Sequence, residues 1–337
     1  MSGGIDSTVA ALLLKREGYE VFGLHMLVPR KEPDEREHLQ RIAHILGIEF
    51  HVVDLRGEFE GLISRFCADY MRGRTPNPCI VCNRDIKFGT LMKKALEMGA
   101  DIFATGHYAR LDKSEHRVKL LRGADRGKEQ SYFLFALKQE QLLRALFPNG
   151  NMSKDEVRKI AADAGLPVLD RGESQEICFL DGRDYRDLLR ERIPESAVPG
   201  EIIDTAGRVI GKHEGIQFYT IGQRRGLGIA LGKPIYVVKI DAKANRVVVG
   251  EKRDLLRKEF TVEDVNWVSI EEPREALTAD AQIRYTHQPS RASIVPIGNG
   301  AVRVEFEQPQ PAITPGQAAV FYDGDVLLGG GWISEVL

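Results

Sequence analysis

The chain of 337 residues is predicted to be an α/β protein with a doubly wound parallel sheet, followed by small β-rich modules that include a C-terminal β-barrel. Two observations lead to this fold class. In the first part, apolar strand patterns alternate with helical patterns of about 10 to 15 residues, which is typical of βαβ units. From about residue 196 onward, short β-type runs and turn sequences dominate instead. We therefore expect three domains, at residues 1–194, 195–254 and 255–337.

The elements of the first part follow from apolar periodicity and from capping residues. The first helix is expected to end at Gly18, since glycine commonly ends a helix. Strands are expected at 19–27, 49–55 and 101–108, and helices at 34–46, 57–72 and 84–98. Ser153, with Glu156 three residues later, predicts the start of one more helix. In the β-rich part, Asn299-Gly300 between two alternating runs predicts a tight hairpin.

Composition excludes several classes of protein. Four cysteines are too few for a disulfide scaffold, which favours a reducing, cytoplasmic compartment. No apolar run is long enough to span a membrane, and no secretory leader is recognisable. The formal net charge of −2 does not by itself indicate a nucleic-acid partner, so only local basic patches could bind one.

The segment SGGIDSTVA at the start of the first helix predicts a phosphate-binding loop. Two glycines let the backbone approach a ligand, and the free N–H groups of the following helix point toward it. Hydroxyl and carboxylate side chains suited to a pyrophosphate and its Mg²⁺ surround them, at Ser2, Asp6, Ser7 and Thr8. The spacing matches neither G-x-x-x-x-G-K-[ST] nor G-x-G-x-x-G. A simple turn with a helix cap is the alternative.

A C-x-x-C pair, Cys79 and Cys82, lies directly behind two prolines. On its own, the pair is compatible with half a zinc site, a redox pair, part of an iron–sulfur site or a sulfur carrier. The other two cysteines, Cys67 and Cys178, lie in apolar surroundings that are equally typical of a buried structural cysteine.

These motifs, taken in their order along the chain, resemble those of a known protein family. S-G-G-x-D-S resembles the PP-loop of the ATP pyrophosphatase superfamily. Together with GRTPNPCIVCNRDIKF, ATGHYAR, KEQSYFL, ESQEICFL, YTIGQRRGLGI and TPGQAAVFYDGDVLLGGGWI, it makes the whole chain similar to the tRNA-specific 2-thiouridylases. That family replaces the C2 oxygen of the wobble uridine with sulfur. The resemblance implies a PP-loop (adenine nucleotide alpha hydrolase-like) domain that uses ATP and Mg²⁺, tRNA as substrate, and a sulfur-donor protein carrying a persulfide.

The resemblance also implies roles for single residues. The ATP site would comprise Ser2, Gly3, Gly4, Asp6, Ser7, Thr8, Met26 and Gly106, with Asp6 facing the metal and phosphates rather than the protein core. Cys178 would carry the persulfide and Cys82 would assist, with a disulfide between the two after transfer. Contacts to tRNA would come from Asn77, Pro78, Cys79, His107, Lys128, Glu129, Gln130, Arg284, Tyr285 and Gln317.

Two departures from the family pattern leave questions open. Many members have an aspartate where this chain has Cys79, so the acid/base role of that position does not carry over. Three thiols, of Cys79, Cys82 and Cys178, would instead allow an iron–sulfur cluster, although a persulfide relay is the preferred hypothesis. The family also has an apolar strand before the loop, whereas this chain begins at the loop, so residues upstream of Met1 are expected.

Two other functions remain as alternatives. One is a PP-loop ligase that adenylates or amidates a small molecule, which would need neither the C-x-x-C pair nor the β-rich part. The other is an RNA-binding protein without catalysis whose cysteines hold a structural metal, which would need a second pair of ligands.

Overall fold

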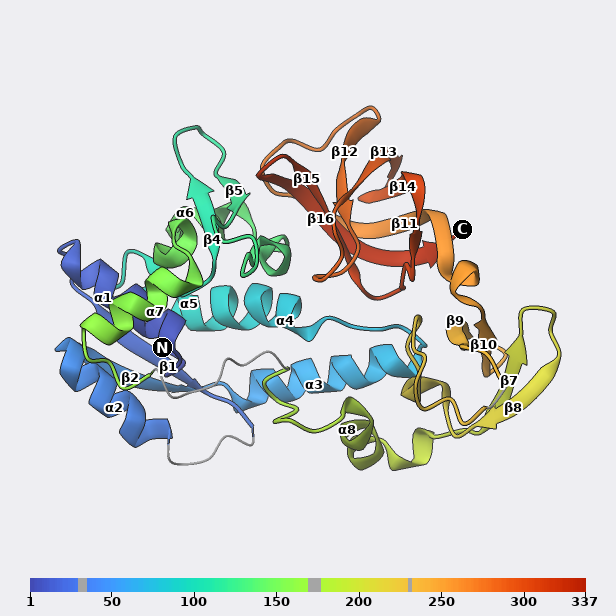
Figure 1. Cartoon of the computed structure of the whole chain (residues 1–337). Coiled ribbons are helices and arrows are strands. Elements are labelled where there is room, and N and C mark those ends of the chain that lie inside the picture. The colour runs from blue at the N-terminus through green and yellow to red at the C-terminus, as the bar shows by residue number, and fades with distance from the viewer. Residues whose placement is uncertain (30–34, 169–176, 230–231) are drawn as a thin grey trace.

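The computed structural model describes residues 1–29, 35–168, 177–229 and 232–337. An α/β part, a small four-stranded sheet and a β-barrel follow one another along the chain (Figure 1). The first half of the α/β part contains α1 (Ile5–Arg16), β1 (Phe22–Leu27), α2 (Glu35–Leu46), β2 (Glu49–Asp54), α3 (Arg56–Met71), α4 (Pro78–Val81), the π-helix η1 (Cys82–Leu91) and α5 (Met92–Glu97). The predicted helices and strands of this half are therefore confirmed, except that the last helix begins at Pro78 rather than at residue 84.

The second half of the α/β part has shorter elements. They are β3 (Phe103–Ala104), β4 (Ala109–Asp112), β5 (Lys119–Arg122), η2 (Ser131–Leu134), α6 (Gln139–Arg144), β6 (Ala145–Leu146), η3 (Pro148–Asn151), α7 (Lys154–Asp163), α8 (Tyr185–Arg192) and η4 (Pro194–Ser196). Ser153 caps α7 and exchanges hydrogen bonds with Glu156, as the capping pattern predicts.

Parallel strand pairs confirm the predicted α/β class. β1 pairs with β2 and β3 pairs with β6, both in parallel register. Among the described residues, the two pairs are not hydrogen-bonded to each other. The amino group of Met1 donates to the carbonyl oxygen of Leu24 in β1. The strand predicted at 101–108 is therefore short, because residues after Ala104 leave the sheet to contact the start of α1.

The β-rich part consists of two separate sheets. The first has the order β8-β7-β10-β9 and comprises β7 (Gly200–Asp204), β8 (Val209–His213), β9 (Tyr236–Asp241) and β10 (Arg246–Gly250), with η5 (Ile216–Phe218) between β8 and β9. After η6 (Lys252–Leu255) the second comprises β11 (Leu256–Trp267), β12 (Leu277–Gln282), β13 (Ser290–Gly298), β14 (Ala301–Pro311), β15 (Ala318–Asp323) and β16 (Val326–Val336). Because β11 pairs with both β14 and β16, these strands close into the predicted barrel.

The predicted hairpin at Asn299-Gly300 joins β13 to β14. Both residues have positive φ, 53° and 68°, as a tight turn of this kind requires.

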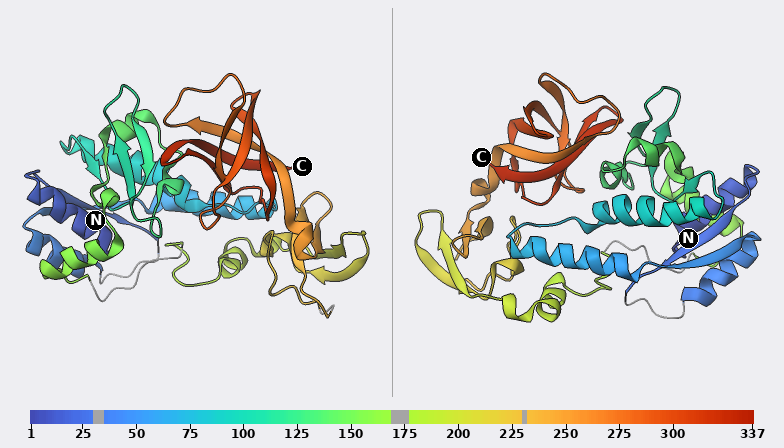
Figure 2. Two further views of the ribbon diagram at one scale, coloured as in Figure 1. Left: turned by 45° about the horizontal axis from the view of Figure 1, so that its top comes forward. Right: turned by 180° about the vertical axis from the view of Figure 1, so that it is seen from behind.

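The barrel is tied to the α/β part by a shared sheet edge. The β4–β5 hairpin adds to the barrel through antiparallel pairing of β5 with β16, at Leu121 opposite Val326. Below it, α3 and the run from α4 to α5 lie side by side and lead from the PP-loop region toward the β-rich part (Figures 1 and 2). The seam between the two long helices and the barrel thus brings together residues from distant parts of the sequence.

Candidate active site

The predicted phosphate loop has the geometry of an anion site. Gly3 has a φ of 78°, and Gly4 is the N-cap of α1 without any side-chain capping bond. The first-turn N–H groups therefore have no side-chain acceptor and point out of the helix. His38 of α2 lies 3.1 Å from the carbonyl oxygen of Gly3 and supports the loop from the other side.

The carboxylate of Asp6 is bound by two side chains of the protein, and its predicted role toward the metal and phosphates stays a prediction. The Nζ of Lys154 lies 2.7 and 2.9 Å from its two carboxylate oxygens, and the hydroxyl of Tyr108 donates to it at 2.7 Å. Only 6% of the Lys154 side chain is exposed, against 37% for Asp6. The reason is that α7 begins directly beside the first turn of α1, so its first residue supplies a buried cation there. A Mg²⁺ ion would have to share this carboxylate with Lys154.

Asn149 and Gly106 complete the floor under the loop. Asn149 is fully buried, and its Nδ2 donates to the carbonyl oxygens of Asp6 at 2.9 Å and Gly106 at 3.3 Å. Its Oδ1 is a buried acceptor without a hydrogen-bond partner among the described residues. A Cβ at Gly106 would lie 2.5 Å from the carbonyl carbon of Asp6, so the glycine is required for close packing. The uncapped first turn of α1 and the glycine loop before it fit a nucleotide phosphate group, and Asn149 and Gly106 hold them in place.

Sequence reasoning missed the two side chains that hold the carboxylate of Asp6. Tyr108 stood inside the motif ATGHYAR, and Lys154 followed the recognised helix cap, but neither position has a local pattern that reports its distant partner. Met26, the other predicted nucleotide contact, lies half-buried in β1 and packs against the core.

The two cysteines of the C-x-x-C pair lie at the start of a widened helix. Pro78 occupies the first turn of α4, where its missing N–H costs nothing, and Cys82 is the first residue of η1. The π-helix is held open by Gln141 of α6, whose Nε2 donates to the carbonyl oxygens of Arg84 at 3.1 Å and Phe88 at 2.9 Å. Lys87 follows Cys82 by five residues in η1, the spacing of the hydrogen bonds in a π-helix, and its ammonium acts on the Cys82 thiol.

Three cysteines and Lys87 share one electrostatic environment. Burial raises the pKa of the Cys82 thiol to about 12, while the ammonium of Lys87 opposes this shift and the charge of Cys178 adds to it. Burial likewise raises the pKa of Cys79, with the same two neighbours acting on it. Cys178 itself is exposed. Cys178 thus contributes to the raised pKa of both other thiols, while the convergence of the three thiols near the target base stays a prediction. Residues 173–176 of the motif around Cys178 lie outside the described residues.

No disulfide joins any of the four cysteines, all of which are described. Cys67 is buried within α3, as expected for a structural residue. Within the described ranges, no three His, Cys, Asp or Glu side chains are grouped so that they could hold a metal ion.

Several residues predicted to contact tRNA hold the protein together. Gln317, in the barrel, donates from Nε2 to the carbonyl oxygens of Thr75 at 2.9 Å and Pro76 at 3.4 Å. It thereby positions the segment that leads into Asn77 and Pro78, of which Asn77 is the N-cap of α4 and makes no side-chain capping bond.

The KEQ motif is also largely internal. Glu129 is buried and pairs with Arg122 at 3.2 Å, and Gln130 accepts from the backbone N–H of Tyr108 at 3.0 Å. Lys128 is half-buried at the edge of this turn.

The remaining three predicted tRNA contacts differ in exposure. Tyr285 is 39% exposed, with its ring centre 4.6 Å from that of Phe133. Arg284 beside it donates to the carbonyl oxygen of Pro311 at 3.0 Å. His107 packs between Phe88 and Phe147, and both burial and the nearby Lys87 hold its pKa well below the usual value, so its ring is neutral.

Comparison with known proteins bears on the whole chain. Family models match in three consecutive segments: a tRNA methyl transferase HUP domain at residues 1–182, a tRNA methyl transferase PRC-barrel domain at 186–251 and an aminomethyltransferase β-barrel domain at 257–333. A relative named tRNA-specific 2-thiouridylase MnmA from Moorella thermoacetica is 48% identical over 351 residues, covering 100% of this chain and 98% of the relative. The protein of that name from Geobacter metallireducens is 48% identical over 354 residues, covering 100% and 96%.

Solved structures resemble the chain more distantly. An NMN synthetase from Francisella tularensis matches with a TM-score of 0.33 and 16% identity, over 56% of this chain and 73% of that one. The U34-tRNA thiolase NcsA from Methanococcus maripaludis, with its [4Fe-4S] cluster, matches with a TM-score of 0.32 and 20% identity, over 58% and 65%. Likeness at this level supports no functional conclusion. From the identity with full-length relatives, the chain belongs to the family of the tRNA-specific 2-thiouridylases.

Proposed function

We propose that this protein is a tRNA-uridine 2-sulfurtransferase that replaces the C2 oxygen of the wobble uridine with sulfur in an ATP-dependent reaction. The relatives that match this chain over nearly their full length are named for this activity. The observation that carries the proposal is the 48% identity over the whole chain, together with a loop before α1 whose N-cap, Gly4, has no side-chain capping bond. Activation of the uracil oxygen requires a phosphate-binding loop for ATP, and sulfur transfer requires a pair of reactive thiols.

The steps divide between these two parts. ATP bound at the loop, with Mg²⁺, adenylates the uracil C2 oxygen and releases pyrophosphate. The terminal sulfur of a persulfide on Cys178 then attacks C2 and AMP leaves. Attack by Cys82 on the Cys178 sulfur breaks the remaining S–S bond, forms a Cys82–Cys178 disulfide and leaves the thiocarbonyl on the base. Since Cys82 is buried with a raised pKa, the exposed Cys178 is suited to accept sulfur from a donor protein.

We also propose the division into domains at 1–194, 195–254 and 255–337, with the barrel and the four-stranded sheet contributing to tRNA binding. The four-stranded sheet lies within 200–250 and the barrel within 256–336, which supports these boundaries. We place the protein in the cytoplasm, where tRNA is modified. Among the described helices, none is both long and apolar enough to cross a bilayer.

The test is transfer of sulfur to tRNA by purified protein. With ATP, Mg²⁺ and a persulfide donor, we expect one thiouridine per tRNA, detected by retardation on a mercury-containing gel. Cys178→Ala and Cys82→Ala should abolish it. Pyrophosphate release that depends on a small molecule instead of tRNA would support the ligase alternative and overturn the proposal.

A further inference from the structure

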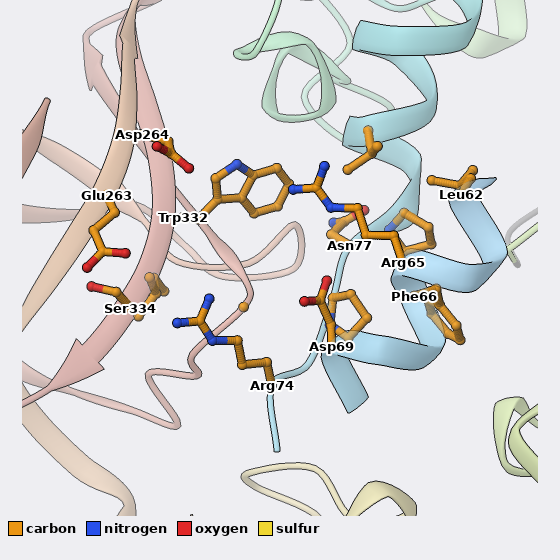
Figure 3. Close-up of a pocket in the computed structure, with 15 residues that line it drawn as sticks. Leu62, Arg65, Phe66, Asp69, Arg74, Asn77, Glu263, Asp264, Trp332 and Ser334 are labelled. Atoms are coloured by element: carbon orange, nitrogen blue, oxygen red, sulfur yellow. The ribbon is translucent and has the colours of Figure 1, made fainter. Parts of the chain in front are cut away.

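A cavity of about 80 Å³ opens at the seam between α3, the segment leading into α4 and the barrel. Its lining includes Arg65 from α3, Arg74 and Asn77 from the connecting segment, and Asp264, Trp332 and Ser334 from the barrel. In Figure 3, Trp332 and Asp264 point from the barrel wall toward Arg65 and Asn77 on the opposite wall. None of Cys79, Cys82 and Cys178 is part of this lining.

The barrel wall is shaped at this place by an irregular strand. The pairing of β11 with β16 shifts register between Glu263 and Asn266, and Asp264 has a φ of 51°. A bulge of this kind at a barrel rim turns a side chain away from the regular alternation of the strand. A left-handed backbone conformation at a residue other than glycine also costs energy. The surrounding barrel holds Asp264 in this conformation despite that cost. Asp264 is thus held in a position that the strand alone would not give it.

The aromatic residue of the cavity is fixed but accessible. The ring of Trp332 meets the ring of Phe135 edge-on, with centres 5.8 Å apart, while the residue as a whole is half-buried and lines the cavity. An indole held on one side and open on the other is a stacking surface for a flat ring.

Five charged side chains line the cavity, the two cations Arg65 and Arg74 and the three carboxylates Asp69, Glu263 and Asp264, and Asp69 is paired with Arg72 at 3.8 Å. In the described part of the chain, neither Arg65 nor Arg74 makes a side-chain hydrogen bond or an ion pair, while the carboxylate of Asp264 acts electrostatically on the guanidinium of Arg84. Guanidinium groups bind phosphate, and a carboxylate accepts from the N–H groups on the edge of a nucleobase. An aromatic face, two cations and an acceptor match the three parts of a nucleotide.

We propose that this cavity binds a second, unreacted nucleotide of the single-stranded loop whose uridine is thiolated, with its base stacked on Trp332 and its phosphate held by Arg65 and Arg74. The inference rests on the proposed function. Asn77 lies in both the cavity and the segment expected to abut the target base, so the two nucleotides are neighbours in space. Because the cavity contains no cysteine, the base it holds is positioned and not modified.

The experiment uses the tryptophan as its own reporter. The chain has two tryptophans, so the full-length Trp267→Phe variant leaves Trp332 as the only one. An anticodon stem-loop RNA with a fluorescein on its stem is titrated while RNA anisotropy and protein emission are recorded together. We expect saturable quenching of Trp332 emission with the same Kd as the anisotropy change. A single abasic substitution at one loop position other than the target uridine should remove the quenching.

Three variants test the contacts themselves. Trp332→Leu should weaken RNA binding about tenfold, within the range for loss of one base stack, whereas Trp332→Phe, the matched control that keeps a ring, should bind nearly as the parent does. Arg65→Gln should lower the slope of log Kd against log salt by about one. The proposed nucleotide site would be wrong if RNA bound without changing Trp332 emission and Trp332→Leu kept full affinity. The proposed function would still stand. Absence of RNA binding in both signals would overturn both.

Discussion

Replacement of Asp6 by alanine is expected to destabilise the protein as well as to stop ATP use. The change removes both hydrogen bonds from Lys154 and the one from Tyr108, and it leaves an ammonium group of which only 6% is exposed without a counter-charge. Breaking a buried ion pair by removing one partner costs about 3–5 kcal/mol. Because Asp6 is itself more than a third exposed, solvent reduces this, and we expect roughly 2–4 kcal/mol.

The loss is measurable by thermal unfolding. For a unit of this size, 1 kcal/mol moves the midpoint by about 2–4 °C, so Asp6→Ala should unfold roughly 5–15 °C below the parent. The double variant Asp6→Ala/Lys154→Met removes both charges and should regain at least half of the loss, since apolar replacement of a buried pair is often neutral. AMP formation should remain absent in both variants, which separates the structural role of the pair from its chemical one.

One result would refute this reasoning. If Asp6→Ala melted at the temperature of the parent protein and the second substitution brought no gain, the pair with Lys154 would contribute nothing to the fold. Asp6 would then act on the metal and phosphates alone.

Four further variants or measurements test the site. Gly106→Ala should cost about 1–3 kcal/mol and lower the affinity for ATP, because its Cβ would overlap the start of α1, while Gly57→Ala, with open space around it, should do neither. Lys128→Ala should weaken binding of matched and mismatched tRNAs equally and reduce the salt dependence, and an effect on matched tRNA alone would contradict this. Cys79→Asp should retain thiolation if sulfur passes by a persulfide relay, and lost activity together with lost iron would support a cluster instead. With its pKa raised from 9.0 to about 12, Cys82 should react with iodoacetamide at pH 8 on the order of 1,000-fold more slowly than an ordinary thiol, and fast labelling of Cys82 in the native protein would contradict the burial described.

Sequence patterns were sufficient to predict those elements that depend only on residues close together in the chain. The alternation of α and β elements, the cap at Ser153 and the hairpin at Asn299-Gly300 all depend on a few neighbouring residues, and all were predicted. The pairing of β5 with β16 was not predicted, because it joins residues far apart in the chain and each strand alone reads as an ordinary short strand. The π-helix was missed for a similar reason, since it is held open by the amide of Gln141 from another helix.

The same distinction applies to the residues expected to contact tRNA. A resemblance assigns a role to a position but does not say whether the side chain performs it directly. Gln317 illustrates the difference, because its amide is occupied by the carbonyl oxygens of Thr75 and Pro76 and therefore fixes the path of the chain before Asn77. Glu129 is likewise engaged with Arg122 in the interior. Residues of this kind govern recognition by holding the backbone that meets the RNA, so their replacement should change the shape of the seam between barrel and α3, where Trp332 and Arg65 remain open to a ligand.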